Sequence, residues 1–135
     1  MMNTVPLFIG LGLGGAIALF ARQMRFDQDR SFYPTVLIVI ASYYVLFAVM
    51  SGAPIVVELV VAGIFSALAI AGARYRVPLA GWGILLHGIF DFTRVGLIGD
   101  GGAPLWWPAF CGGIDVVLGL WLLAPSYLSK PDVRA

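Results

Sequence analysis

Residues 35–72 read TVLIVIASYYVLFAVMSGAPIVVELVVAGIFSALAIAG, which is two apolar runs separated by the short segment SGA at 51–53. Each run has about the 17 to 25 residues that a helix needs to cross a ~30 Å hydrocarbon core. The only charged residue in the whole stretch is Glu58. The stretch therefore predicts two transmembrane helices joined by a tight turn.

Three further apolar runs of similar length occupy most of the remaining chain. The five predicted spans are residues 5–21, 35–51, 54–72, 79–98 and 105–124. Of the 135 residues, 61% are hydrophobic and 11% are charged, whereas about a quarter of a soluble domain is charged. So few charged residues cannot give a soluble core its polar shell. The sequence predicts a single all-α membrane domain, residues 1–135, built as a bundle of five transmembrane helices.

Basic residues outside the spans fall in alternate segments of the chain. These segments contain Arg22, Arg25 and Arg30, then Arg74 and Arg76, and finally Lys130 and Arg134. With five crossings, all three segments lie on one side of the membrane, which the positive-inside tendency makes the cytoplasmic side. We therefore expect the N-terminus outside and the C-terminus in the cytoplasm.

Charge, cysteine content and small residues limit the partners. The net charge is +1 with no long basic block, so nothing predicts a nucleic-acid partner, and the single Cys111 excludes an internal disulfide. Small residues recur one turn apart at Gly10, Gly14 and Ala18, and again at Gly63, Ala67 and Ala71. Such faces let helices approach closely in lipid. They predict packing within the bundle, between copies, or against a larger membrane complex.

Five ionisable residues fall inside the predicted spans, where a charge is costly and usually faces a protein interior or a wet cavity. They are Glu58, His87, Asp91, Arg94 and Asp115. His87, Asp91 and Arg94 are spaced i, i+4, i+7 and share one helix face. With a rise of ~1.5 Å per residue, the four charged side chains lie ~6 to ~15 Å below the outer helix ends, and His87 is near mid-membrane. We expect them to meet in the outer half of the bilayer.

This set has the chemistry of a site for a proton, a small cation or a small ligand. We assign Asp91 and Asp115 as its core carboxylates, with Glu58 at the mouth. Arg94 is the counter-charge and His87 a relay. Three carboxylates against one arginine leave two excess negative charges when all are ionised and His87 is neutral. Because apolar surroundings do not sustain such an excess, a carboxyl must be protonated or a cation bound.

Aromatic residues could line the predicted site, and its side chains could bind a metal ion. Tyr43 and Tyr44, near the middle of the second span, and Trp106 and Trp107, at the outer interface, are candidates to line the site. For the two tryptophans, an anchor at the membrane interface is the favoured interpretation. A histidine-rich zinc site is excluded because His87 has no second histidine, but mixed His/Asp/Glu coordination stays open. No particular cofactor is indicated.

A purely structural interpretation of the same residues is also open. Arg94 would pair with Asp91, Asp115 or Glu58 and so fasten helices together. Glu58, close to a helix end, would extend its carboxylate to the outer surface.

The strings HGIFDF (residues 87–92) and PLWWPAFCGGID (residues 104–115) resemble small bacterial integral membrane proteins of uncharacterised function. The resemblance covers mainly the last two spans and brings no catalytic or binding residues. It implies a multi-pass protein of the bacterial inner membrane.

Three functions follow from these patterns. The leading one is a binding or proton-handling site in the outer half of the bilayer. The second is an accessory subunit that packs against a larger membrane complex through its small-residue faces. The third is a membrane-embedded metal-dependent hydrolase or lipid-modifying enzyme, against which the short loops and the lone histidine count.

Overall fold

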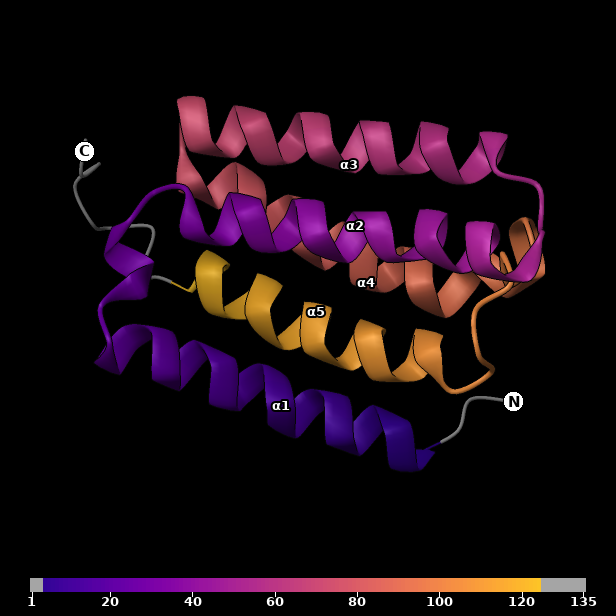
Figure 1. Cartoon of the computed structure of the whole chain (residues 1–135). Helices are drawn as coiled ribbons and strands as arrows, with labels where there is room; N and C mark the ends of the chain where they lie inside the picture. The colour runs from indigo at the N-terminus through magenta and orange to yellow at the C-terminus, as the bar shows by residue number, and fades with distance from the viewer. Residues whose placement is uncertain (1–3, 125–135) are drawn as a thin grey trace.

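Five α-helices lie side by side in one bundle in the computed structural model, which describes residues 4–124 (Figure 1). The elements are α1 (Thr4–Gln23), the short 3₁₀ helix η1 (Phe26–Gln28), α2 (Phe32–Ser51), α3 (Val56–Arg74), α4 (Val77–Leu97) and α5 (Trp107–Leu123). The described residues contain no strand. The all-helical prediction is confirmed. Lys130 and Arg134, on which part of the topology prediction rests, lie outside the described residues.

Three of the helices are long and apolar enough to cross a membrane. They are α1, α2 and α3, with mean hydropathies of 2.0, 2.0 and 2.2 over their most apolar windows. The apolar helix α5 is shorter, with 17 residues, and α4 carries His87, Asp91 and Arg94. Large apolar side chains cover the outer surface, with Leu97, Met50 and Leu105 among the most exposed. A surface of this kind suits lipid as its solvent.

The helix ends follow local sequence signals. Pro78 and Pro108 lie in the first turns of α4 and α5, where the missing N–H leaves no helical hydrogen bond unmade. Gly52 ends α2 in the left-handed conformation, with φ of 75°, and its N–H donates to the Ala48 carbonyl. The α4 helix begins at Val77, two residues before the predicted span. The prediction placed Pro78 before the helix, but proline is tolerated inside the first turn.

Helix α5 packs between α1 and α4, and α4 also packs against α2 and α3. Gly14 permits the first of these contacts, because a Cβ there would lie 3.0 Å from the Ile114 carbonyl oxygen. By contrast, Gly63 and Ala67 are exposed on α3, and a Cβ at Gly63 would meet nothing within 4 Å. One small-residue face therefore serves the bundle, and the other faces outward.

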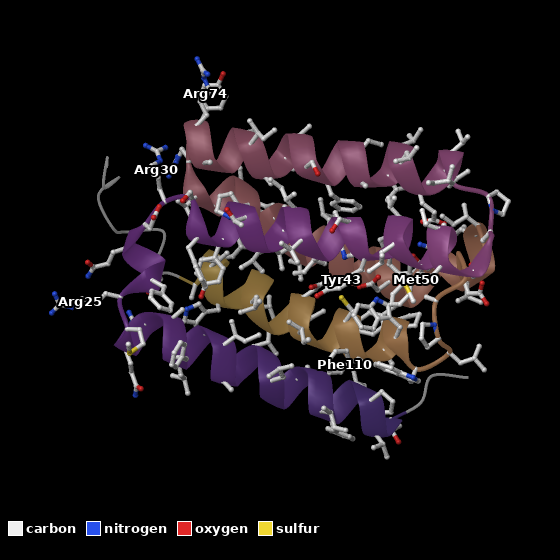
Figure 2. The ribbon with its side chains drawn as sticks, viewed as in Figure 1. Arg25, Arg30, Tyr43, Met50, Arg74 and Phe110 are labelled. Atoms are coloured by element: carbon white, nitrogen blue, oxygen red, sulfur yellow. The ribbon has the colours of Figure 1, made fainter. Side chains whose placement is uncertain are left out.

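The two ends of the bundle differ in charge. Figure 2 shows Arg25, Arg30 and Arg74 gathered at one end, while Met50 lies toward the other. The basic end includes a turn before α2 in which the Ser31 N–H and hydroxyl both donate to Asp29 Oδ1, at 2.9 and 2.7 Å. These two hydrogen bonds lower the pKa of Asp29 below its usual range, so Asp29 is an anion at neutral pH.

Candidate functional site

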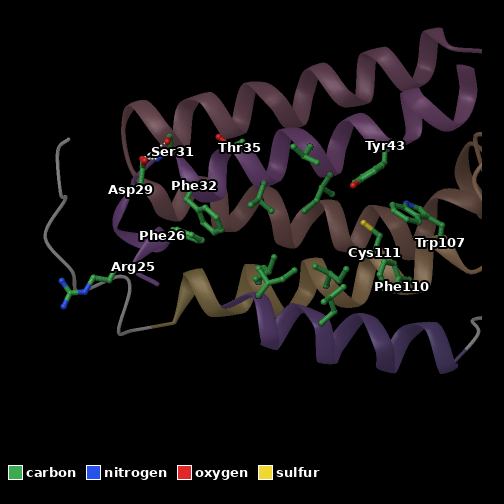
Figure 3. Close-up of a pocket in the computed structure, with 17 residues that line it drawn as sticks. Arg25, Phe26, Asp29, Ser31, Phe32, Thr35, Tyr43, Trp107, Phe110 and Cys111 are labelled. Carbon is green, nitrogen blue, oxygen red and sulfur yellow. Dashed lines mark hydrogen bonds between the residues drawn. The ribbon is translucent and has the colours of Figure 1, made fainter. Parts of the chain in front are cut away.

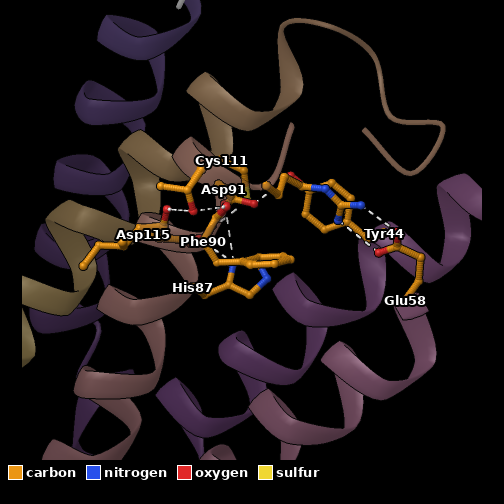
Figure 4. Close-up of polar contacts among 10 residues, drawn as sticks. Tyr44, Glu58, His87, Phe90, Asp91, Cys111 and Asp115 are labelled. Carbon is orange, nitrogen blue, oxygen red and sulfur yellow. Dashed lines mark hydrogen bonds and ion pairs between the residues drawn. The ribbon is translucent and has the colours of Figure 1, made fainter. Parts of the chain in front are cut away.

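Six polar side chains from four helices meet inside the bundle (Figure 4). They are Tyr44 from α2, Glu58 from α3, His87, Asp91 and Arg94 from α4, and Asp115 from α5. None is more than 4% exposed. The five ionisable residues singled out in the sequence thus lie close together, as two groups connected by Tyr44.

The first group is an ion pair between α3 and α4. The Arg94 guanidinium donates from Nη1 to Glu58 Oε2 at 3.0 Å and from Nη2 to Glu58 Oε1 at 2.6 Å. Its Nε donates to the Gly99 carbonyl at 2.8 Å. This two-pronged geometry is the strongest arrangement open to an arginine and a carboxylate. The partner of Arg94 is therefore Glu58, and the Glu58 side chain turns inward instead of reaching for the outer surface.

The connector between α4 and α5 closes over this ion pair. Gly101 has φ of 63°, and a Cβ at this position would lie 2.6 Å from both Arg94 Nη2 and Glu58 Oε1. Glycine is required twice over here, by the left-handed backbone and by the lack of space.

Tyr44 connects the ion pair to the second group. Its hydroxyl donates to Asp91 Oδ1 at 2.7 Å. Its ring stacks under the guanidinium, with Arg94 Cζ 3.9 Å from the ring centroid. A cation at that distance from a ring face is attracted by the ring quadrupole. Tyr44 therefore contacts both Asp91 and Arg94 with one side chain.

The second group, which we call the proton cluster, consists of His87, Asp91 and Asp115. His87 Nδ1 lies 2.8 Å from Asp115 Oδ2 and 3.4 Å from Asp91 Oδ2. The Phe65 ring packs edge-on against the imidazole with centroids 4.7 Å apart. The Cys111 thiol lies 3.9 Å from Asp115 Oδ2. One ring nitrogen therefore faces two carboxylates from two helices in a largely apolar enclosure.

Glycines bring α4 and α5 close enough for this contact. A Cβ at Gly88 would lie 2.9 Å from the Asp115 Cβ, and one at Gly119 would lie 2.8 Å from backbone atoms of Leu85. Larger residues at either position would force the helices apart. The short distance between His87 and Asp115 therefore depends on Gly88 and Gly119, which have no side chain.

Three buried polar atoms of the proton cluster have no hydrogen-bond partner among residues 4–124. They are His87 Nε2, Asp91 Oδ2 and Asp115 Oδ1. Buried polar groups without a partner are rare and usually mark a bound water, an ion or a working group. In the described part of the chain, the proton cluster is also a group of at least three residues that could hold a metal ion, with ligand atoms within 4.8 Å of one another.

The ion pair changes the charge balance expected from the sequence. Because Glu58 and Arg94 neutralise each other, the excess charge falls on Asp91 and Asp115 alone. With both ionised, the proton cluster carries two negative charges when His87 is neutral and one when it is protonated. Such charge without a counter-ion is unfavourable in an apolar interior, and a bound proton or cation would relieve it.

The four aromatic candidates take different positions. Tyr44 belongs to the site, whereas Tyr43 and Trp107, with ring centroids 5.0 Å apart, line a separate groove. Trp106 is 47% exposed on the outside of the bundle. Two further contributions have no sequence signal: the Gly99 carbonyl, which is a backbone group, and the Phe65 ring, one of many apolar side chains in its span.

No protein-family model, curated protein sequence or solved structure matches this chain.

Proposed function

We propose that this chain is a membrane protein that crosses the bilayer five times and takes up and releases a proton at His87, Asp91 and Asp115. The observation that carries the proposal is the position of His87 Nδ1 between two buried carboxylates, 2.8 Å from one and 3.4 Å from the other. The one Nδ1 N–H makes its short hydrogen bond to a single carboxylate, Asp115 at 2.8 Å. Because Asp91 also accepts the Tyr44 hydroxyl, its ionised form is the better supported of the two, and Asp115 is the natural holder of an additional proton.

A proton suits this geometry better than a metal ion. Zinc binds nitrogen and oxygen at about 2.0 to 2.2 Å, so two ligand atoms in a tetrahedral site stand ~3.3 Å apart. His87 Nδ1 and Asp115 Oδ2 are 2.8 Å apart, a hydrogen-bond separation. A metal would require the two side chains to separate first.

Contacts around the proton cluster connect its protonation state to the Glu58–Arg94 ion pair. When Asp115 takes up a proton, it no longer attracts the imidazole N–H as strongly, and Asp91 becomes the better acceptor. Asp91 already accepts the Tyr44 hydroxyl, and the Tyr44 ring holds Arg94. Protonation thereby acts through Tyr44 on the ion pair and on the connector that Arg94 holds at Gly99. A proton-coupled movement of that connector follows.

Stability across pH tests the proposal. Toward alkaline pH the proton cluster loses its shared proton, and Asp91 and Asp115 repel each other, so the melting temperature in detergent should fall. Because Asp115→Asn removes one of the two charges, it should flatten this fall. The exposed Asp100→Asn is the matched control and should keep the wild-type profile. Identical profiles for wild type and Asp115→Asn across pH and across mono- and divalent cations would contradict the proposal, and a shift with a divalent ion alone would favour a metal.

The proposed topology has the N-terminus outside, the C-terminus in the cytoplasm, and the proton cluster in the outer half of the bilayer. It is supported by Arg25, Arg30 and Arg74 lying at one end of the bundle (Figure 2). The connectors at the opposite end, residues 52–55 and 98–106, contain no lysine or arginine.

Cysteine labelling tests this topology. In a Cys111→Ala background, we expect Asp100→Cys to react with a membrane-impermeant maleimide in intact cells. We expect Arg74→Cys to react only after the membrane is opened. Asp100 is preferred to Gly101 because a side chain at Gly101 would meet Arg94 and Glu58. Labelling of both cysteines from the same side would exclude five crossings.

A second function, that of an accessory membrane subunit, is favoured by the outward face of α3. Gly63 and Ala67 are exposed there, and small residues commonly bring helices together in lipid. The enclosed Glu58–Arg94 pair would then serve only to fasten α3 to α4. This function would replace the first if the pH profile proved insensitive to Asp115→Asn.

A further inference from the structure

A large groove runs along the outside of the bundle, and its lining includes Cys111 but none of His87, Asp91 and Asp115 (Figure 3). Its volume is about 930 Å³, at the upper end of the range for ligand sites. Apolar side chains of α1, α2 and α5 form its walls and floor, among them Ile17, Val39 and Ile114. The groove is therefore an apolar surface that is open to the surroundings of the bundle.

Polar character is concentrated at one end of the groove. Arg25, Asp29 and Ser31 lie at this end, between α1 and α2. The Arg25 side chain has no partner within residues 4–124, and Asp29 is anionic with its Oδ2 unused by Ser31. Arg25 also has a left-handed backbone, with φ of 63°, which is uncommon for a residue other than glycine and is found preferentially at functional sites. A cation and an anion thus both belong to the mouth of the groove, and the Arg25 side chain extends outward from it (Figure 3).

The length of the groove matches one leaflet of a bilayer. Along α2 it extends from Phe32 to Tyr43, which at a rise of ~1.5 Å per residue is ~16 Å. Half of a ~30 Å hydrocarbon core is ~15 Å. A lipid tail entering beside Phe32 would therefore end near Tyr43 and Cys111.

We propose that this groove binds one zwitterionic, amine-bearing phospholipid, of the phosphatidylethanolamine class. An acyl chain lies against the apolar wall, the phosphate meets the Arg25 guanidinium, and the ammonium group meets the Asp29 carboxylate. A lipid with an anionic glycerol headgroup would satisfy Arg25 but would face repulsion from Asp29. The charges of the headgroup thus decide which lipid class the groove binds.

Native mass spectrometry of the full chain in detergent tests this site, with phosphatidylethanolamine and phosphatidylglycerol of identical acyl chains as probes. We expect one phosphatidylethanolamine per chain, bound about three- to fivefold more tightly than phosphatidylglycerol, the size of one exposed charge contact. Asp29→Asn should abolish this preference. Arg25→Gln should weaken both lipids about three- to fivefold. Arg76→Gln, which removes an exposed charge away from the groove, should change neither.

A second pair of variants tests the groove itself. Val39→Trp fills the groove and should eliminate stoichiometric lipid, whereas Val60→Trp, on the exposed face of α3, should not. Circular dichroism confirms that each variant is folded. The proposal is wrong if wild type retains no lipid, or if Arg25→Gln and Val39→Trp retain as much as their controls. A dimer that Val39→Trp disrupts would instead assign the groove to a second copy of the chain.

Discussion

Arg94→Ala lowers the free energy of unfolding by about 3 to 5 kcal/mol, the cost of leaving a buried charge without its partner. Arg94 is fully buried, and both of its terminal nitrogens donate to Glu58. Without the guanidinium, the Glu58 carboxylate remains inside the bundle with no counter-charge. The Gly99 carbonyl loses its donor as well. Unfolding of the purified protein in mixed detergent micelles, followed by circular dichroism, measures the loss.

The double variant Glu58→Leu/Arg94→Met distinguishes a broken ion pair from a general packing defect. Because it removes both charges and keeps apolar volume, it should be more stable than Arg94→Ala. The exposed Arg76→Ala should lie within about 0.5 kcal/mol of wild type. Strict additivity of the Glu58 and Arg94 single variants would show that the two side chains do not act as a pair.

His87→Leu destabilises the protein by a similar amount, about 3 to 5 kcal/mol, at alkaline pH and by less at acidic pH. The substitution leaves Asp91 and Asp115 facing each other with no imidazole between them. When both carboxylates are ionised, they repel each other in the folded variant, whereas unfolding separates them in water, so a shared proton relieves the repulsion only in the folded state. The folded state then binds more protons, so stability must fall as the pH rises.

A double variant is the control for the pH dependence of His87→Leu. His87→Leu/Asp115→Leu removes one of the two facing carboxylates and should regain most of the stability lost at alkaline pH. Chemical denaturation of all three proteins at several pH values gives the comparison. An equal loss for His87→Leu at both ends of the pH range would mean that the imidazole only fills space.

The helices could be predicted from the sequence because their signals are local. The apolar runs gave five helices, and the observed helices begin and end within a few residues of the predicted limits. A rise of ~1.5 Å per residue also placed Glu58 and Arg94 at the same depth, where they form an ion pair. The depth of a residue below the helix end depends only on its position along the helix, and that position can be counted in the sequence.

Pairing within the site could not be predicted because it depends on how each helix is rotated and how closely the helices approach. Asp91 lies about one turn from Arg94 along α4 and was also an open partner. The structure instead turns Asp91 toward Tyr44 and His87. Gly88 and Gly101 decide these distances through the absence of a side chain. Neither position shows its role without the three-dimensional arrangement.

The most direct measurement of the proton cluster uses the fact that the chain contains one histidine. In protein labelled with ¹⁵N only at histidine, both imidazole nitrogens observed by NMR belong to His87. If the proton cluster shares a proton, Nδ1 carries a hydrogen-bonded proton, the signals change as the pH is varied, and Asp115→Asn and Asp91→Asn each alter that change. Signals that stay the same across pH and in both variants would contradict a shared proton at this site.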